Sequence, residues 1–70
     1  MKILDYKLIS KRKTISYGTL VEHYLPGFYK EFEKCVNEHI ETGYTPIGGI
    51  ETTYIEGDHI LTQTMVLYEN

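Results

Sequence analysis

Three histidines, one cysteine and ten carboxylates are the side chains of this chain that could do metal, nucleophilic or acid–base chemistry. His23, His39 and His59 follow no metal-ligand spacing, and a single cysteine cannot supply a thiolate zinc cage. Cys35 and His39 would share a helix face, but Cys35 also falls on an apolar stripe, where it is more often a small core residue. It lacks the adjacent base and accessible cleft that a nucleophile needs. We therefore predict no catalytic residue, no metal site and no cofactor.

Two other patterns are better explained by structure than by chemistry. Gly48 and Gly49 lack the GxxxxGK spacing of a phosphate-binding loop and open a strand rather than a helix. We expect them to permit close packing, because a strand glycine lets a helix or a neighbouring chain approach the sheet. Glu31 and Glu38 neighbour lysines on the predicted helix, which indicates a solvated face and not a glycosidase carboxylate pair.

Charge is divided unequally along the chain, whose formal net charge is −3. Residues 1–35 hold all seven Lys and Arg against four acidic residues, or +3, whereas residues 36–70 hold six acidic residues and no Lys or Arg, or −6. This polarity favours self-association or a charged partner. The one basic cluster, Lys11-Arg12-Lys13, is too small a footprint for duplex nucleic acid. We expect that triplet to form a solvated turn.

A chain of 70 residues allows one domain, residues 1–70, with a small core. The lone cysteine excludes an internal disulfide and fits a reducing, cytoplasmic setting. The sequence contains no signal-peptide core and no apolar run long enough to span a membrane. We predict a soluble cytoplasmic protein that gains stability by oligomerisation.

The hydrophobic pattern predicts four segments. Alternation over residues 2–9 indicates a strand, and residues 10–27 fit no single period and are predicted as a long loop. Residues 28–42 are predicted as an amphipathic helix, and residues 45–68 as a hairpin that turns at Glu56-Gly57-Asp58. The apolar stripe of the helix consists of Phe28, Phe32, Cys35, Val36 and Ile40. The fold class is therefore α+β, with β-α-β-β order and one amphipathic helix packed on a three-stranded antiparallel sheet.

The last strand is apolar on both faces, although one helix can cover only one face of a sheet. The two alternating sets are Leu61, Met65 and Leu67 against Ile60, Val66 and Tyr68. A partner subunit, the long loop or a ligand must cover the other face, because large exposed apolar patches are uncommon on monomers. We expect a homo-oligomer that forms through this open sheet face.

Tyrosines are the most informative candidates for contact with a ligand, since seven occur in the chain and tyrosine is enriched at binding surfaces. Tyr6, Tyr44 and Tyr68 are expected in or beside the core. The long loop is a second source of contacts, because loops on a rigid scaffold often carry function. An alternative is that this loop only covers the sheet. The predicted ligand-binding set is Arg12, Tyr17, His23, Tyr24, Tyr29 and Tyr54.

The stretch EFEKCVNEHIETGYTPIGGI over residues 31–50 resembles a family of small bacterial and phage proteins known as domain of unknown function 1737. The family pattern joins a Tyr-Lys strand, a helix, a Gly-Tyr step, a Pro-x-Gly-Gly turn and a final Gln-x-Met strand. The matching positions are Tyr6-Lys7, Phe32 to Ile40, Gly43-Tyr44, Pro46 to Gly49 and Gln63-Thr64-Met65. The resemblance implies a fold and no activity. The chain departs from the family pattern at residues 10–27, where family members have a short turn.

Three functions remain open. The first is a non-enzymatic, homo-oligomeric small-molecule-binding protein. By analogy with short phage proteins, it would be an anti-defence sponge that sequesters nucleotide immune signals in intersubunit pockets. The second is a protein-interaction module or inhibitor that binds a host protein through its acidic C-terminal half. The third, a small enzyme, has no catalytic constellation to support it.

Overall fold

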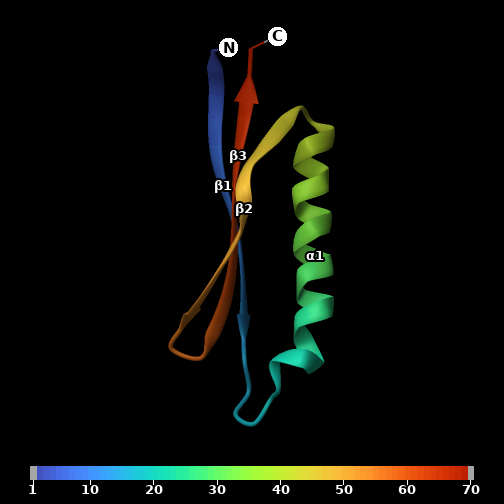
Figure 1. Ribbon diagram of the computed structural model, residues 1–70, viewed down its shortest axis with the longest axis vertical. Coiled ribbons are helices and arrows are strands. Elements are labelled where there is room, and N and C mark those ends of the chain that lie inside the picture. The colour runs from blue at the N-terminus through green and yellow to red at the C-terminus, as the bar shows by residue number, and fades with distance from the viewer. Residues whose placement is uncertain (1, 70) are drawn as a thin grey trace.

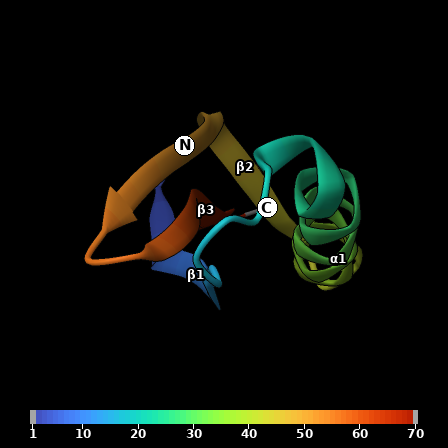
Figure 2. The same ribbon diagram turned by 90° about the horizontal axis from the view of Figure 1, so that it is seen from below.

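A helix lies along one side of a three-stranded antiparallel sheet in the computed structural model, which describes residues 2–69 (Figure 1). The elements are β1 (Ile3–Thr14), α1 (Val21–Glu41), β2 (Tyr44–Ile55) and β3 (Asp58–Tyr68). This arrangement confirms the predicted α+β class and the β-α-β-β order. Seen from below, α1 lies to one side of all three strands, so that one face of the sheet is left without a covering element (Figure 2).

The strand order is β1-β3-β2, which places the last strand at the centre and the other two at the edges. β2 and β3 are joined by the two-residue turn Glu56-Gly57, and Ile55 pairs with Asp58 across it. Both turn residues have positive φ, 47° and 82°, which is the conformation of a type I′ hairpin turn. The predicted hairpin is therefore present, with a turn one residue shorter than predicted.

The prediction of a loop over residues 10–27 is wrong at both ends, because β1 continues to Thr14 and α1 begins at Val21. The basic triplet lies in β1 and does not form a turn. Lys11 Nζ lies 3.4 Å from a carboxylate oxygen of Glu31 on α1. Arg12 Nε lies 3.3 Å from a carboxylate oxygen of Asp58 on β3. Because side chains alternate along a strand, Lys11 and Arg12 point to opposite faces of the sheet and pair with different carboxylates. A run of basic residues in the sequence does not indicate this arrangement.

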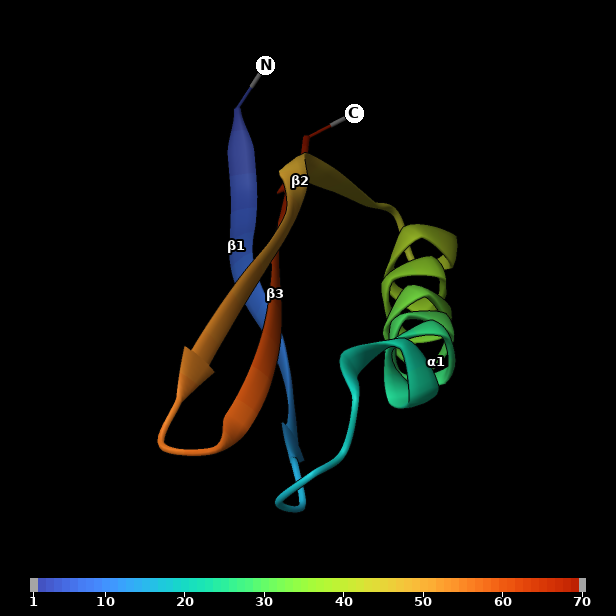
Figure 3. The same cartoon turned by 60° about the horizontal axis from the view of Figure 1, so that its bottom comes forward.

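The early start of α1 was missed because Pro26 normally ends or kinks a helix. In the structure Pro26 lies inside α1, and the first turn is set off from the axis of the remaining helix, as expected at a proline (Figure 3). The turn before the proline carries Tyr24, which is buried in the core. Burial of an aromatic side chain contributes enough to offset the lost helical hydrogen bond.

The core lies between α1 and the central strand. Phe32, Leu61 and Met65 are completely buried there. Of the predicted helical stripe, Cys35 is half-buried and Ile40 is 43% exposed, so both lie at the margin of the core. The core cluster consists of Ile9, Tyr24, Phe28, Phe32, Val36, Leu61 and Met65.

The double glycine forms a bulge in β2, where pairing with β3 breaks between Ile47 and Glu51. Gly48 has φ of 72°, which glycine adopts readily. The helix does not pack against the pair, since a Cβ at Gly48 or Gly49 would meet no atom of this chain within 4 Å. Close approach by a neighbouring chain stays a prediction. Gln63 Nε2 donates to the carbonyl oxygens of Ile47 at 3.1 Å and Gly48 at 3.3 Å. The buried Gln63 side chain therefore satisfies the backbone that the bulge withdraws from the ladder.

We expect Gln63→Met to lower the free energy of unfolding by about 1–2 kcal/mol, because the bulge carbonyls would lose their donor. Thr53→Val is an exposed change on β2, the strand that carries the bulge, and its free energy of unfolding should stay within about 0.5 kcal/mol of the wild-type value. Urea denaturation at one fixed protein concentration measures both values. Equal effects of the two changes would show that the Gln63 amide does not support the bulge.

Candidate functional site

Two tyrosines and a histidine meet on the helix-covered side of the sheet, beside the β2–β3 hairpin. His59 opens the inward-facing set of β3, Tyr24 comes from the first turn of α1, and Tyr54 is the β2 residue paired with His59. The Tyr24 hydroxyl lies 2.9 Å from His59 Nδ1. The Tyr54 ring stacks on the imidazole at a centroid distance of 4.4 Å, and Phe28 packs edge-on at 5.4 Å. We call Tyr24, Phe28, Tyr54 and His59 the aromatic cluster.

Burial favours the neutral forms of two members of the aromatic cluster, His59 and Tyr24. His59 has no exposed surface, and desolvation lowers the pKa of its imidazole below the ordinary value of 6.5. Desolvation raises the pKa of Tyr24, with a further contribution from the nearby Tyr54 hydroxyl. Among the residues described, His59 Nε2 has no hydrogen-bond partner. A buried neutral imidazole without a carboxylate partner stabilises the packing of α1 on the hairpin and is poorly placed for acid–base catalysis.

Three predicted ligand-binding residues lie between α1 and β2. Tyr24 and Tyr54 belong to the aromatic cluster, and the Tyr29 hydroxyl lies 3.2 Å from the Thr52 hydroxyl on β2. Tyr24 is buried, so it has a structural role, whereas Tyr54 remains 57% exposed. The structure thus brings these three tyrosines together, although their hydroxyl and ring contacts are made within the protein.

The other three predicted residues do not join them. Arg12 lies on β1 and is paired with Asp58. Tyr17 stands fully exposed in the connection between β1 and α1. His23 is exposed in the first turn of α1. The six predicted residues therefore do not form one site.

A second candidate site is the side of the sheet that faces away from α1, which we call the open face. Alternation in β1 turns Ile9 toward the core and Tyr6 and Leu8 to the open face, where they are 65% and 59% exposed. Tyr6 pairs with Val66, and Leu8 pairs with Thr64, which in turn pairs with Ile47. These neighbours form an apolar patch on the open face that consists of Tyr6, Leu8 and Ile47. Val66 lies beside Tyr6 but is itself buried, at 4% exposure.

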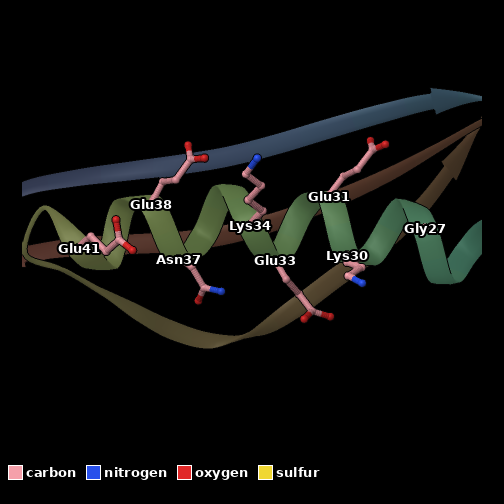
Figure 4. A pocket seen from close by; sticks show the side chains of 8 residues that line it. All are labelled: Gly27, Lys30, Glu31, Glu33, Lys34, Asn37, Glu38 and Glu41. Carbon is pink, nitrogen blue, oxygen red and sulfur yellow. The ribbon is translucent and has the colours of Figure 1, made fainter.

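The hollows of the surface are shallow on the helix side. One of about 830 Å³ follows the solvent side of α1, but every residue that lines it comes from that helix (Figure 4). The labelled side chains are mainly Lys and Glu and point in different directions, so no second element closes the space. A groove of about 310 Å³ separates α1 from β1 and is lined by Lys11, Glu31, Lys34, Cys35 and Glu38. Neither hollow encloses a ligand within one subunit.

A further hollow of about 210 Å³ opens at the β2 bulge. Thr62 and Thr64 of β3 and Glu51 of β2 line it together with the double glycine. The sequence reading missed both this hollow and the aromatic cluster. The signal that could have placed the imidazole in the core is strand alternation, because His59 faces the same side of the last strand as Leu61 and Met65.

Within residues 2–69, no group of three or more His, Cys, Asp or Glu side chains is placed to hold a metal ion. His39 Nδ1 lies 2.8 Å from the carbonyl oxygen of Cys35, so this pair makes a bond within the helix. Of the residues described, none form a helix with the combined length and apolarity needed to cross a membrane.

No family model, curated protein or solved structure matches the chain. Membership of the domain of unknown function 1737 family therefore stays a prediction. The structure does show that two segments carrying the resemblance meet, because Gln63 of the Gln-x-Met strand donates to the backbone of the Pro-x-Gly-Gly turn.

We expect the free energy of unfolding to decrease as the pH falls below about 6.5, where an unfolded histidine begins to bind a proton. His59 has a lowered pKa in the folded state, so the unfolded chain takes up its proton first and is favoured by acid. His59→Phe should reduce this dependence between pH 7.5 and 5.5, and His23→Gln, at an exposed position, should keep it. Urea denaturation at both pH values is the measurement. A His59→Phe variant with the wild-type pH dependence would disprove this assignment.

Proposed function

We propose that this chain is a non-enzymatic, homo-oligomeric small-molecule-binding protein whose ligand pockets form between subunits. The observation that carries the proposal is the apolar patch on the open face, where Tyr6 and Leu8 are each more than half exposed and Ile47 is 43% exposed. Monomeric proteins rarely leave such contiguous apolar surface in water, because burying it is favourable.

A second copy of the chain is the partner that this surface fits best. The apolar patch contains no charged side chain. Strands of 11 or 12 residues are about 40 Å long, and three strands side by side span about 14 Å, which gives a face of about 560 Å². Two copies that covered this whole face, including its charged residues Arg12, Glu51 and Asp58, would bury about 1,100 Å² in total, which is close to the roughly 1,000 Å² expected of a specific interface.

Ligand binding between subunits is supported by the shape of the single subunit. Its hollows are open grooves, and a second copy on the open face would close the one at the β2 bulge, which borders that face. Tyr6 offers an exposed ring on that face for stacking against a ligand. Arg12 is the member of the predicted ligand-binding set on the same face, and it would meet an anionic ligand group by exchanging its Asp58 partner for it. The finer proposal, a cytoplasmic phage sponge for nucleotide immune signals, rests on the family resemblance and the small size of the chain.

Leu8→Glu should convert the oligomer to a monomer, because it would place a charge in the centre of the buried patch. Leu20→Glu is the matched control, since Leu20 is similarly exposed, at 53%, but lies in the β1–α1 connection. Native mass spectrometry of gently purified protein reports subunit number and any retained small molecule. A wild-type monomer, or equal effects of the two variants, would reject assembly through the open face.

The ligand half of the proposal needs its own measurement. Cyclic nucleotides and ADP-ribose derivatives should raise the melting temperature of the wild-type protein, because a ligand that binds the folded state stabilises it. The Leu8→Glu monomer should show a smaller rise at the same ligand concentration. Unchanged melting temperatures across the whole panel would exclude nucleotides as the ligand class.

A second function, a protein-interaction module, is favoured by the acidic edge of the sheet. Glu51 and Glu56 are exposed on β2 and its turn, and no Lys or Arg follows residue 35. Asp58 weakens this surface because it is paired with Arg12. If an acidic edge binds a host protein, Glu51→Lys together with Glu56→Lys should abolish its capture, and unchanged capture would reject this role.

A further inference from the structure

The bulge in β2 leaves a hollow of about 210 Å³ in an otherwise continuous ladder. Residues 48–50 have no register partner on β3. Because no atom lies within 4 Å of a Cβ built at Gly48 or Gly49, no neighbouring side chain occupies the space above them. The volume corresponds to roughly seven water molecules at about 30 Å³ each, which suits a sugar ring and not a whole nucleotide.

Polar groups line one rim of this hollow. Glu51 pairs with Thr62, and Ile47 pairs with Thr64, so the carboxylate and both hydroxyls belong to the open face. Thr62 and Thr64 are two residues apart on one strand, which separates their Cα atoms by about 7 Å. The hydroxyls can donate and accept, whereas the carboxylate only accepts. The rim thus has a hydrogen-bond acceptor on β2, the Glu51 carboxylate, and two hydroxyls on β3 that can both donate and accept.

We propose that this hollow is a subsite for a vicinal diol, the ribose of a nucleoside being the ligand group of that class. A carboxylate that accepts hydrogen bonds from ribose hydroxyls is the arrangement by which dinucleotide-binding folds hold ribose. Glu51 would accept hydrogen bonds from the diol hydroxyls. The Thr62 and Thr64 hydroxyls would donate to the diol oxygens or accept from the diol protons that Glu51 does not bind. The same carboxylate disfavours a phosphate at this position, because two negative charges would lie side by side.

Two structural features support this assignment. The carbonyls of Ile47 and Gly48 are already bonded by Gln63 Nε2, and the polar side chains at the rim are those of Glu51, Thr62 and Thr64. Ile47 belongs to both the hollow and the apolar patch, which makes the two contiguous. The inference therefore rests on the proposed function, since a second copy on the patch would cover a sugar bound in the hollow.

Amide chemical shifts of ¹⁵N-labelled protein, titrated with adenosine and with 2′,3′-dideoxyadenosine, test the diol directly. We expect adenosine to shift the Gly48 and Gly49 amides, and we expect the dideoxy compound to bind at least tenfold more weakly. Glu51→Gln should weaken adenosine binding to a similar degree. Glu56→Gln is the matched control, since Glu56 is an exposed glutamate in the neighbouring turn, and it should bind as the wild type does.

Absence of shifts, equal shifts with the two nucleosides, or an unaltered Glu51→Gln titration would each overturn the subsite. The same spectra show whether a variant is folded, and Thr62→Val serves as a second variant if Glu51→Gln is not. An oligomer in native mass spectra without these shifts would reject the subsite and keep the proposed assembly. A monomer with diol-dependent binding would keep the subsite and reject assembly through the open face.

Discussion

One helix covers one face of a three-stranded sheet, and both the core and the exposed surface of the molecule depend on that constraint. Phe28 and Phe32 of α1 pack on Leu61 and Met65 of the central strand, and each such burial contributes about 1.5–3 kcal/mol. β3 is central, so its inward residues form the floor of the core. Its outward residues are flanked by both edge strands but covered by no element. The core that stabilises the fold therefore creates the surface that remains to be covered.

The bulge follows from a second constraint on β2. This strand leaves α1 directly and must turn back along the central strand while remaining an edge, as its course across the sheet shows (Figure 2). A bulge increases local twist and bends the strand. The bulge leaves backbone carbonyls without ladder partners, and the buried side-chain amide of Gln63 donates to two of them, those of Ile47 and Gly48. The polar hollow on the opposite side is the space that this rearrangement opens.

The sequence predicted the elements whose periodicity is regular. Alternation in the first and last strands and the spacing of Phe28, Phe32 and Val36 gave the fold class, because these positions report directly on burial. The start of α1 was missed because Pro26 is a local signal for a helix end, which the buried contact of Tyr24 with His59 overrides. The end of β1 was missed because the basic triplet is typical of a loop, whereas Lys11 and Arg12 are each paired with a carboxylate. The candidate site was predicted less well. Tyr24 was chosen for its type, but its hydroxyl is directed to His59, a contact between residues 35 positions apart that no local pattern contains.

The edges of the sheet explain why its face is the better surface for self-association. Edge strands invite pairing with another chain unless charges, prolines or bulges prevent it. β1 carries Lys7, Lys11 and Lys13 along its length, and β2 is interrupted by Pro46 and by the bulge. Both edges thus have the features that block strand addition, whereas the apolar patch has none. A small domain with a limited core gains most from covering that patch with a second copy, because the covering surface buries apolar area without requiring new backbone pairing.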